Sequence, residues 1–123
     1  MEILLQRSER PEVVVCTNDS WAIGALSACF QAGVRVPQDI ALTGFDNDMI
    51  TPFTQPPLTT MAQQIKELSV TAVELLLKAI REKKTSIEDD VIKVPAVLTV
   101  RESCGDRLKN SSRREESAFS SVK

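Results

Sequence analysis

The sequence predicts an α/β protein built on a parallel β-sheet. An apolar, β-branched run covers residues 13–16, a helix-compatible segment covers 21–32, and a second apolar run covers 40–45. An apolar run without alternation is typical of a strand that is buried on both faces of a parallel sheet. The three segments therefore form a βαβ unit, and its right-handed crossover makes the two strands parallel.

Local signals mark the ends of the predicted helix. Asn18, Asp19 and Ser20 offer side chains that can cap its first turn, and Gly33 suits the left-handed position that follows a helix. Pro37 then marks a turn before the second strand. Because the helix is apolar almost all round, we expect it to be largely buried.

In the second half of the chain, the sequence predicts a loop, a helix and two strand segments separated by a proline. Residues 46–57 hold two aspartates, an asparagine and three prolines, which favour a surface loop. Helical spacing of apolar residues predicts an amphipathic helix over 64–82, and Pro95 separates two strand candidates, 91–94 and 96–100. The apolar residues at that helical spacing are Ile65, Leu68, Ala72, Leu75, Leu76 and Ala79. The Ser-rich tail 105–123 is predicted to be disordered.

Composition restricts the function classes. The chain has 123 residues with 42% apolar and 26% charged content, which is ordinary for one globular domain. Its net charge is −2, and it lacks the clustered Lys and Arg residues of a DNA-binding surface. No apolar run approaches the roughly 20 residues that cross a bilayer, and the start lacks the pattern of a signal peptide. We therefore expect a cytoplasmic protein.

Two polar clusters define the candidate ligand site. Thr17-Asn18-Asp19 follows the first strand and Asp46-Asn47-Asp48 follows the second, so both lie at the carboxyl edge of the sheet, where α/β proteins bind ligands. An amide beside a carboxylate offers donors and acceptors that suit a polyol or sugar-like ligand. The alternatives are that Asn18 or Asp19 only caps the helix and that Asp46 only starts a turn.

Residue inventory argues against most enzyme classes. The chain contains no His, so it cannot form a His-dependent triad or a His metal site, and it contains no P-loop. Cys16 and Cys29 are interpreted as packing residues, and three cysteines at unrelated spacings indicate neither a disulfide framework nor a metal. We expect no cofactor and no catalytic residue; a hydrolase that uses Asp19 and Asp46 is the enzymatic alternative. Trp21 and Phe30 are more typical of core than of a ligand platform, although an exposed face could serve a subunit contact.

Several motifs in order give the chain a resemblance to a known family. Over residues 10–103 it resembles the LacI/GalR family of bacterial transcriptional regulators. The motifs that carry this resemblance are Thr17-Asn18-Asp19 with Ala22-Ile23-Gly24-Ala25-Leu26, Gly33-Val34-Arg35-Val36-Pro37-Gln38-Asp39-Ile40, Gly44-Phe45-Asp46-Asn47, Pro56-Pro57-Leu58-Thr59-Thr60 with Gln63, Leu75-Leu76-Leu77 and Arg101-Glu102-Ser103. Any one of them is weak, but their order and spacing are specific.

The resemblance implies an effector-binding fragment of the carboxy-terminal lobe in a periplasmic-binding-protein-like (type I) fold. It implies that Asn18, Asp46 and Gln63 contact a sugar-like or nucleobase-like effector, with Trp21 beside the site. Residues 1–104 would be a partial sensor domain, of which 64–94 belongs to a missing first lobe. The apolar faces of that segment would then lack their usual partners, and DNA contact would need the missing amino-terminal domain of a full-length parent.

The same resemblance implies a homodimer. The residues expected at its interface are Ala22, Ala25, Leu26, Cys29, Phe30, Ile50, Pro52 and Phe53. A periplasmic-type sugar-binding protein, which would share the fold, is the non-enzymatic alternative.

Overall fold

The computed structural model describes residues 1–83 and 91–106, and the chain divides into two compact units. One unit comprises Met1–Ala62 and the chain from Leu98 onward, and the other comprises Gln63–Val97.

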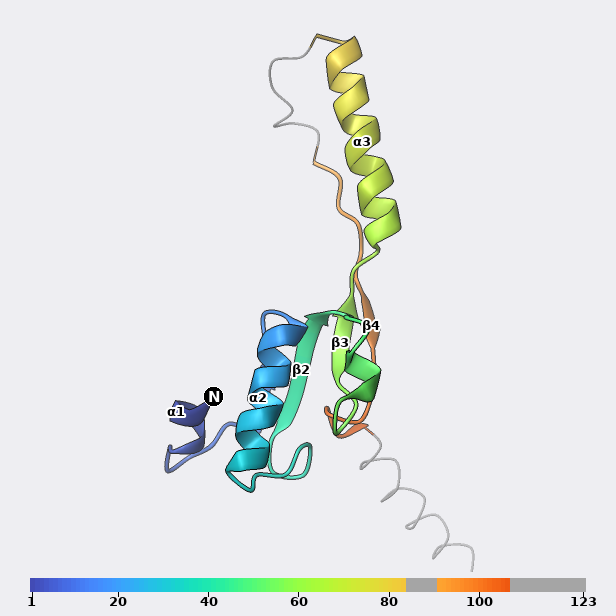
Figure 1. Cartoon of the computed structure of the whole chain (residues 1–123). Helices are drawn as coiled ribbons and strands as arrows, with labels where there is room; N and C mark the ends of the chain where they lie inside the picture. The colour runs from blue at the N-terminus through green and yellow to red at the C-terminus, as the bar shows by residue number, and fades with distance from the viewer. Residues whose placement is uncertain (84–90, 107–123) are drawn as a thin grey trace, which may run out of the picture. The chain divides into compact units, whose positions relative to one another are not determined.

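A four-stranded sheet organises the first unit (Figure 1). Its strands are β1 (Val13–Val15), β2 (Ala41–Asp46), β3 (Thr59–Ala62) and β4 (Val97–Thr99), in the spatial order β1-β2-β3-β4. β1 pairs with β2, and β2 pairs with β3, in parallel register. The predicted α/β class with a parallel sheet is therefore confirmed, although β3 did not stand out as a strand in the sequence.

Helix α2 (Asp19–Gln31) connects β1 to β2 and covers one face of the sheet (Figure 1). It packs against the core through one side, where Leu26 and Cys29 meet Ile40 and Leu42. The expectation that this helix is largely buried was wrong, because Trp21 is 70% and Phe30 is 86% exposed. A helix that lies on the outside of a sheet buries only the stripe that faces it.

The prediction that β1 is buried on both faces was also wrong. Val14 packs against the core, whereas Val13 and Val15 are exposed, Val15 by 77%. Successive strand residues point to opposite faces, so both faces are buried only when both are covered. In the described residues, α2 covers one of them.

Two short helices complete the first unit. Helix α1 (Glu2–Leu5) contributes Leu5 to the core, and the 3₁₀ helix η1 (Thr51–Phe53) lies within the predicted loop 46–57. Neither was apparent from the sequence, because a single turn gives no periodic pattern.

Helix α2 and strand β2 approach each other closely at Gly44. A Cβ atom at this position would collide with Oδ1 of Asp19, whose side chain is fully buried. Only a residue without a side chain therefore lets the first turn of α2 lie directly on β2.

The chain returns to the sheet after β4 through a buried serine. Ser103 Oγ donates to the carbonyl oxygen of Leu42 (2.6 Å) and accepts from the backbone N–H of Thr59 (2.8 Å), while Ser103 O accepts from Leu42 N–H (2.9 Å). This single residue joins β2, β3 and the end of the described chain.

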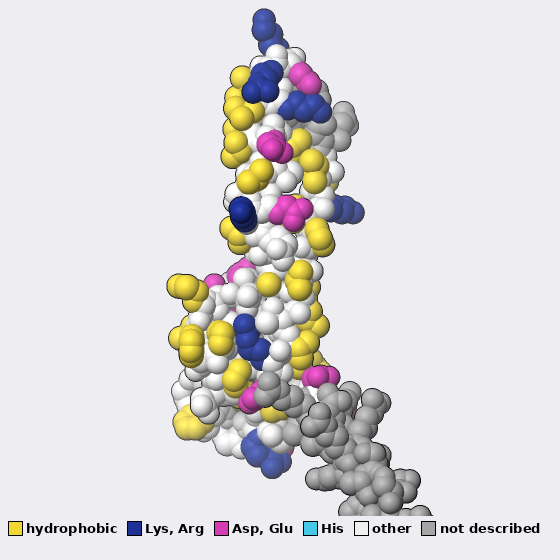
Figure 2. All heavy atoms as spheres, turned by 90° about the vertical axis from the view of Figure 1, so that its right-hand side faces the viewer, with side chains coloured by type: hydrophobic (Ala, Val, Ile, Leu, Met, Phe, Trp, Pro, Cys, Tyr) yellow, Lys and Arg dark blue, Asp and Glu magenta, His cyan; other side chains and the backbone are white. Residues whose placement is uncertain are grey.

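Helix α3 (Ile65–Arg81) belongs to the second unit and confirms the helix predicted over 64–82. Most of its apolar residues are exposed, and among the described residues of this helix only Ala79 is buried. Figure 2 shows hydrophobic side chains gathered along this part of the surface. The strand predicted at 91–94 is absent: residues 91–96 have no regular structure, and the strand predicted at 96–100 is Val97–Thr99.

Most of the tail predicted to be disordered, residues 107–123, lies outside the described residues. Within residues 1–83 and 91–106, no helix combines the length and the apolar character that a membrane crossing needs.

We predict that Gly44→Ala lowers the free energy of unfolding by about 2–4 kcal/mol, because the new methyl group displaces the buried Asp19 carboxylate. Urea unfolding followed by circular dichroism measures the change. Gly24→Ala is the matched control: Gly24 lies inside α2 with no atom near its missing Cβ, so alanine should stabilise the helix by about 0.5–1 kcal/mol. Equal effects of the two substitutions would contradict the close approach.

We predict that Ser103→Ala costs about 2 kcal/mol, since it leaves the buried carbonyl of Leu42 and the buried N–H of Thr59 without their partner. The same substitution at Ser27, on the exposed side of α2, should change stability by less than about 0.5 kcal/mol. A Ser103→Ala protein as stable as the parent in thermal unfolding would show that the serine does not hold the returning chain.

Candidate functional site

The two polar clusters meet at one edge of the sheet. Because β1 and β2 are parallel, the segments that follow them leave from the same side. The backbone N–H of Asp48 donates to Asp19 Oδ2 at 2.8 Å, which joins the cluster after β2 directly to the cluster after β1. The segments that contain Asn18 and Asp46 therefore leave the sheet at the same edge.

Asn18 caps helix α2. Its backbone is extended, and its Oδ1 accepts a hydrogen bond from the N–H of Trp21 at 3.0 Å. Asn18 is therefore a helix cap, and its predicted role in ligand binding stays a prediction. With Oδ1 engaged, a further hydrogen bond from this half-buried side chain would be donated by Nδ2.

Asp19 is a structural carboxylate and not an exposed acid. Its Oδ1 accepts from the hydroxyl of Thr60 at 2.6 Å, its Oδ2 accepts from Asp48 N–H, and the side chain has no exposed surface. Because this carboxylate is enclosed and both of its oxygens are engaged within the chain, it does not face a substrate. The hydrolase alternative that used Asp19 with Asp46 therefore loses one of its two acids.

Asp46 and Asn47 lie in an uncommon backbone conformation. Their φ angles are +108° and +59°, in the left-handed region that few residues other than glycine adopt. Such conformations persist where the surroundings hold them, and they concentrate at functional sites. Both side chains are half-buried at the end of β2.

Asn47 is held from two sides. Its backbone N–H donates to Thr60 Oγ1 (3.3 Å), and its side-chain Oδ1 accepts from Arg101 Nη2 (2.7 Å). Arg101 Nη1 also donates to the carbonyl oxygen of Leu58 (2.7 Å), so the guanidinium ties the turn to the start of β3. Sequence reasoning missed Thr60 and Arg101 as parts of this frame; both occur in the motifs quoted above, but those motifs gave no contact between them and Asn47.

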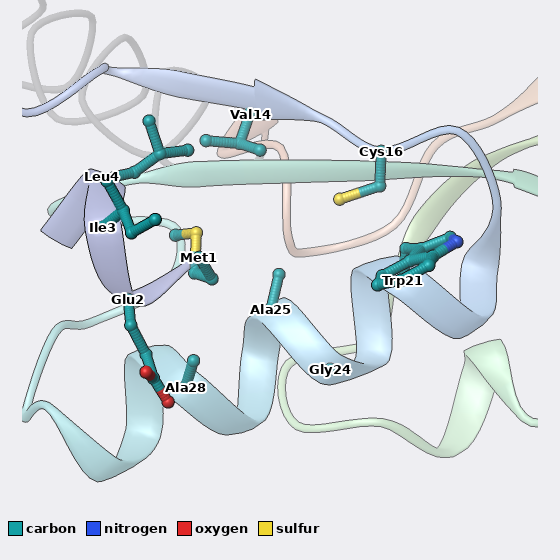
Figure 3. Close-up of a pocket in the computed structure, with 10 residues that line it drawn as sticks. All are labelled: Met1, Glu2, Ile3, Leu4, Val14, Cys16, Trp21, Gly24, Ala25 and Ala28. Carbon is teal, nitrogen blue, oxygen red and sulfur yellow. The ribbon is translucent and has the colours of Figure 1, made fainter.

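Trp21 lies on the side of α2 that faces β1 and α1 (Figure 3). It lines a surface cavity of about 480 Å³ together with Val14, Cys16 and residues of α1. Neither Asn18 nor Asp46 lines this cavity, which is largely apolar. Its lining therefore does not match the expected polar ligand, and the polar edge remains the candidate site.

Gln63 directly follows Ala62, the last residue of β3, and is the first residue of the second unit. Its predicted role at the site stays a prediction.

The structure divides the expected dimer residues into two groups. Ala22, Ala25, Leu26 and Cys29 belong to the buried core of this chain, so their assignment to a dimer interface is corrected. They pack inward because they form the stripe of α2 that faces the sheet. The residues that remain exposed are Phe30, Ile50, Pro52 and Phe53.

The described cysteines are free thiols. Burial raises the pKa of Cys16 and of Cys29 above the ordinary value for a thiol, which favours the unreactive protonated form. Within the described ranges, no group of three or more Cys, Asp or Glu side chains could hold a metal ion.

Comparison with known proteins places the chain in a family. The family model described as periplasmic binding protein-like domain matches residues 1–104. The chain is 42% identical over 108 residues to the HTH-type transcriptional repressor PurR of Pasteurella multocida, covering 88% of this chain and 32% of that protein. It is 38% identical over 98 residues to the ribose operon repressor of Haemophilus influenzae, covering 80% of this chain and 30% of that protein. The chain thus spans about a third of the length of these curated relatives.

Solved structures agree with the sequence relatives. A LacI family transcriptional regulator from an Arthrobacter species, in complex with lactose, superposes with a TM-score of 0.71 at 30% identity, covering 84% of this chain and 38% of that one. A LacI family regulator from Lactobacillus casei with bound glucose gives a TM-score of 0.67 at 30% identity, covering 83% and 36%. The chain therefore belongs to the periplasmic binding protein-like domain family and corresponds to part of the effector-binding domain of LacI/GalR-type regulators.

Proposed function

We propose that the chain is the part of a cytoplasmic LacI/GalR-type transcriptional regulator that holds a small hydroxylated effector through Asp46. The observation that carries this proposal is the Asp46–Asn47 turn, in which two residues with positive φ follow a strand and are fastened from β3 and from the returning chain. A half-buried carboxylate in such a turn can accept hydrogen bonds from two adjacent hydroxyls.

The chemistry of the edge favours a sugar-like effector, with a nucleobase-like one as the second class. Asn18 can donate from Nδ2 and Asp46 can accept, so the pair is complementary to a group that both donates and accepts. Two structural neighbours were solved with lactose and with glucose, which supports the sugar class. Gln63 is proposed as a further contact, whereas Trp21 lines the separate apolar cavity.

The proposal favours a regulator over a periplasmic-type sugar-binding protein, because the relatives and neighbours described above are transcriptional repressors and regulators. In a full-length regulator, DNA would be contacted by an amino-terminal domain outside these 123 residues, and residues 64–94 would belong to its first lobe. The exposed apolar surface of α3 is the surface that such a lobe would cover.

A functional test places this chain in a complete regulator. The chain would replace the matching third of the Pasteurella multocida repressor, and repression of a reporter gene would be measured with lactose, glucose, ribose and adenine. A reporter response to at least one compound supports the proposal. A chimera that is stable and binds its operator but responds to none of them would refute the proposed effector classes.

We predict that Asp46→Asn and Asp46→Gly in this chimera each weaken effector binding by about 2 kcal/mol or more, the scale of hydrogen bonds to a charged group. Asn and Gly both tolerate the left-handed backbone at this position, so the loss would report the carboxylate and not the turn. Isothermal titration calorimetry gives the affinity. Asp39→Asn is the control, since Asp39 precedes β2 and lies about 20 Å along the chain from Asp46 at the other end of this strand. Unchanged affinity in both Asp46 variants would remove Asp46 from the site.

We also propose a homodimer that uses the exposed residues Phe30, Ile50, Pro52 and Phe53. Phe53 is 77% exposed on η1, and Phe30 shares a surface hollow with Gln55 and Pro56, which follow η1. Aromatic residues exposed in one region are typical of protein interfaces.

We predict that the chain sediments at micromolar concentration as a species larger than its 13.6 kDa monomer and that Phe53→Glu restores the monomer. Leu76→Glu is the control, because it places the same charge on the exposed apolar surface of α3. If Leu76→Glu dissociates the oligomer and Phe53→Glu does not, then α3 and not η1 mediates association.

A further inference from the structure

We propose that Asp19 is a positioning residue for the effector site: its buried carboxylate holds the turn that carries Asp46. This inference rests on the proposed function for its ligand and on hydrogen bonds within the chain for its mechanism. Asp19 is buried and has no exposed surface for an effector, so it acts only through its neighbours.

The carboxylate joins three elements at one point. Asp19 is the first residue of α2, Thr60 lies on β3, and Asp48 lies in the loop that follows β2. Oδ1 accepts from Thr60 Oγ1 at 2.6 Å and Oδ2 accepts from Asp48 N–H at 2.8 Å. Asp46, the last residue of β2, lies only two residues before Asp48. A shift of Asp48 therefore also moves the end of β2.

The Thr60 hydroxyl extends this control to Asn47. Because Thr60 donates its hydroxyl hydrogen to Asp19, its oxygen is oriented to accept from the N–H of Asn47. Asp19 therefore fastens both residues that follow Asp46, one directly and one through Thr60. A turn with two positive φ angles relaxes toward ordinary conformations unless it is held in this way.

The hydrogen-bond pattern and the space around Asp19 both fit this role. Both partners are donors, and an ionised carboxylate is the side chain that accepts at two oxygens and donates nothing. Gly44 provides the room, since any Cβ there would meet Oδ1 of Asp19. An asparagine at position 19 would keep the shape and replace one acceptor with a donor.

Amide hydrogen exchange, measured by NMR on the chain itself, tests the inference without any effector. In Asp19→Asn we expect the Asp48 amide to exchange about tenfold faster than in the parent. In Thr60→Val we expect the same acceleration at the Asn47 amide. About tenfold is the effect of losing one hydrogen bond to a charged or buried group. Thr60→Ser keeps the hydroxyl and should restore parent exchange at Asn47. Ile40→Val, a truncation in the core, controls for general loss of stability.

A positioning role for Asp19 predicts faster amide exchange only near the turn that it holds. The Asp48 amide in Asp19→Asn should exchange faster than in Ile40→Val while the amides of Leu42 and Ala25 exchange alike in the two proteins. Uniform acceleration of all amides, or Asp48 exchange no faster than in Ile40→Val, would overturn the inference and leave Asp19 with only a general role in stability.

A second measurement separates this inference from the proposed function. Glucose affinity would be measured by calorimetry for the parent, Asp19→Asn and Ile40→Val proteins in the complete chimera described above. Local loosening with about tenfold weaker binding in Asp19→Asn alone supports both proposals. If the parent chimera does not bind glucose, the effector class is in doubt and the exchange pattern still decides the role of Asp19. Local loosening with unchanged glucose affinity would show that the turn is held by Asp19 but that the site does not depend on it.

Discussion

A single buried carboxylate sets the geometry of the polar edge in this structure. Asp19 begins the helix that covers the sheet, and its two oxygens receive hydrogen bonds from β3 and from the loop after β2. Burying such a group is costly unless every oxygen has a partner, so helix, strand and loop must keep their relative positions. The absence of a side chain at Gly44 is the corresponding steric condition, because it lets the carboxylate lie against β2.

Residues 101–103, which follow β4, hold the same region through further hydrogen bonds. Arg101 donates to Asn47 and to the carbonyl of Leu58, and Ser103 joins the backbones of β2 and β3. The motif Arg101-Glu102-Ser103, which the sequence offers only as a family signature, thus has a physical role. Arg101 holds the turn after β2 through a hydrogen bond to Asn47, 54 positions earlier in the chain.

The apolar surface of the chain indicates which contacts lie beyond it. Val15 on β1, Phe53 on η1 and most apolar residues of α3 are exposed, whereas the core beneath α2 is tightly buried. Exposed apolar area on this scale is typical of surfaces that meet another domain or subunit. The curated relatives are about three times as long as this chain.

The sequence alone suffices to predict the βαβ unit, its parallel strands and the meeting of two polar clusters at one edge, because local periodicity and the handedness of the crossover encode them. It also contained the Asn18 cap and the helix Ile65–Arg81. Tertiary contacts were needed to show that Asp19 is enclosed, that Ala22 and Cys29 face the core, and that Trp21 and Phe30 remain exposed. The physical reason is that burial and hydrogen-bond partners depend on residues far apart in the chain, such as Asp19 and Thr60, whose approach no local pattern encodes.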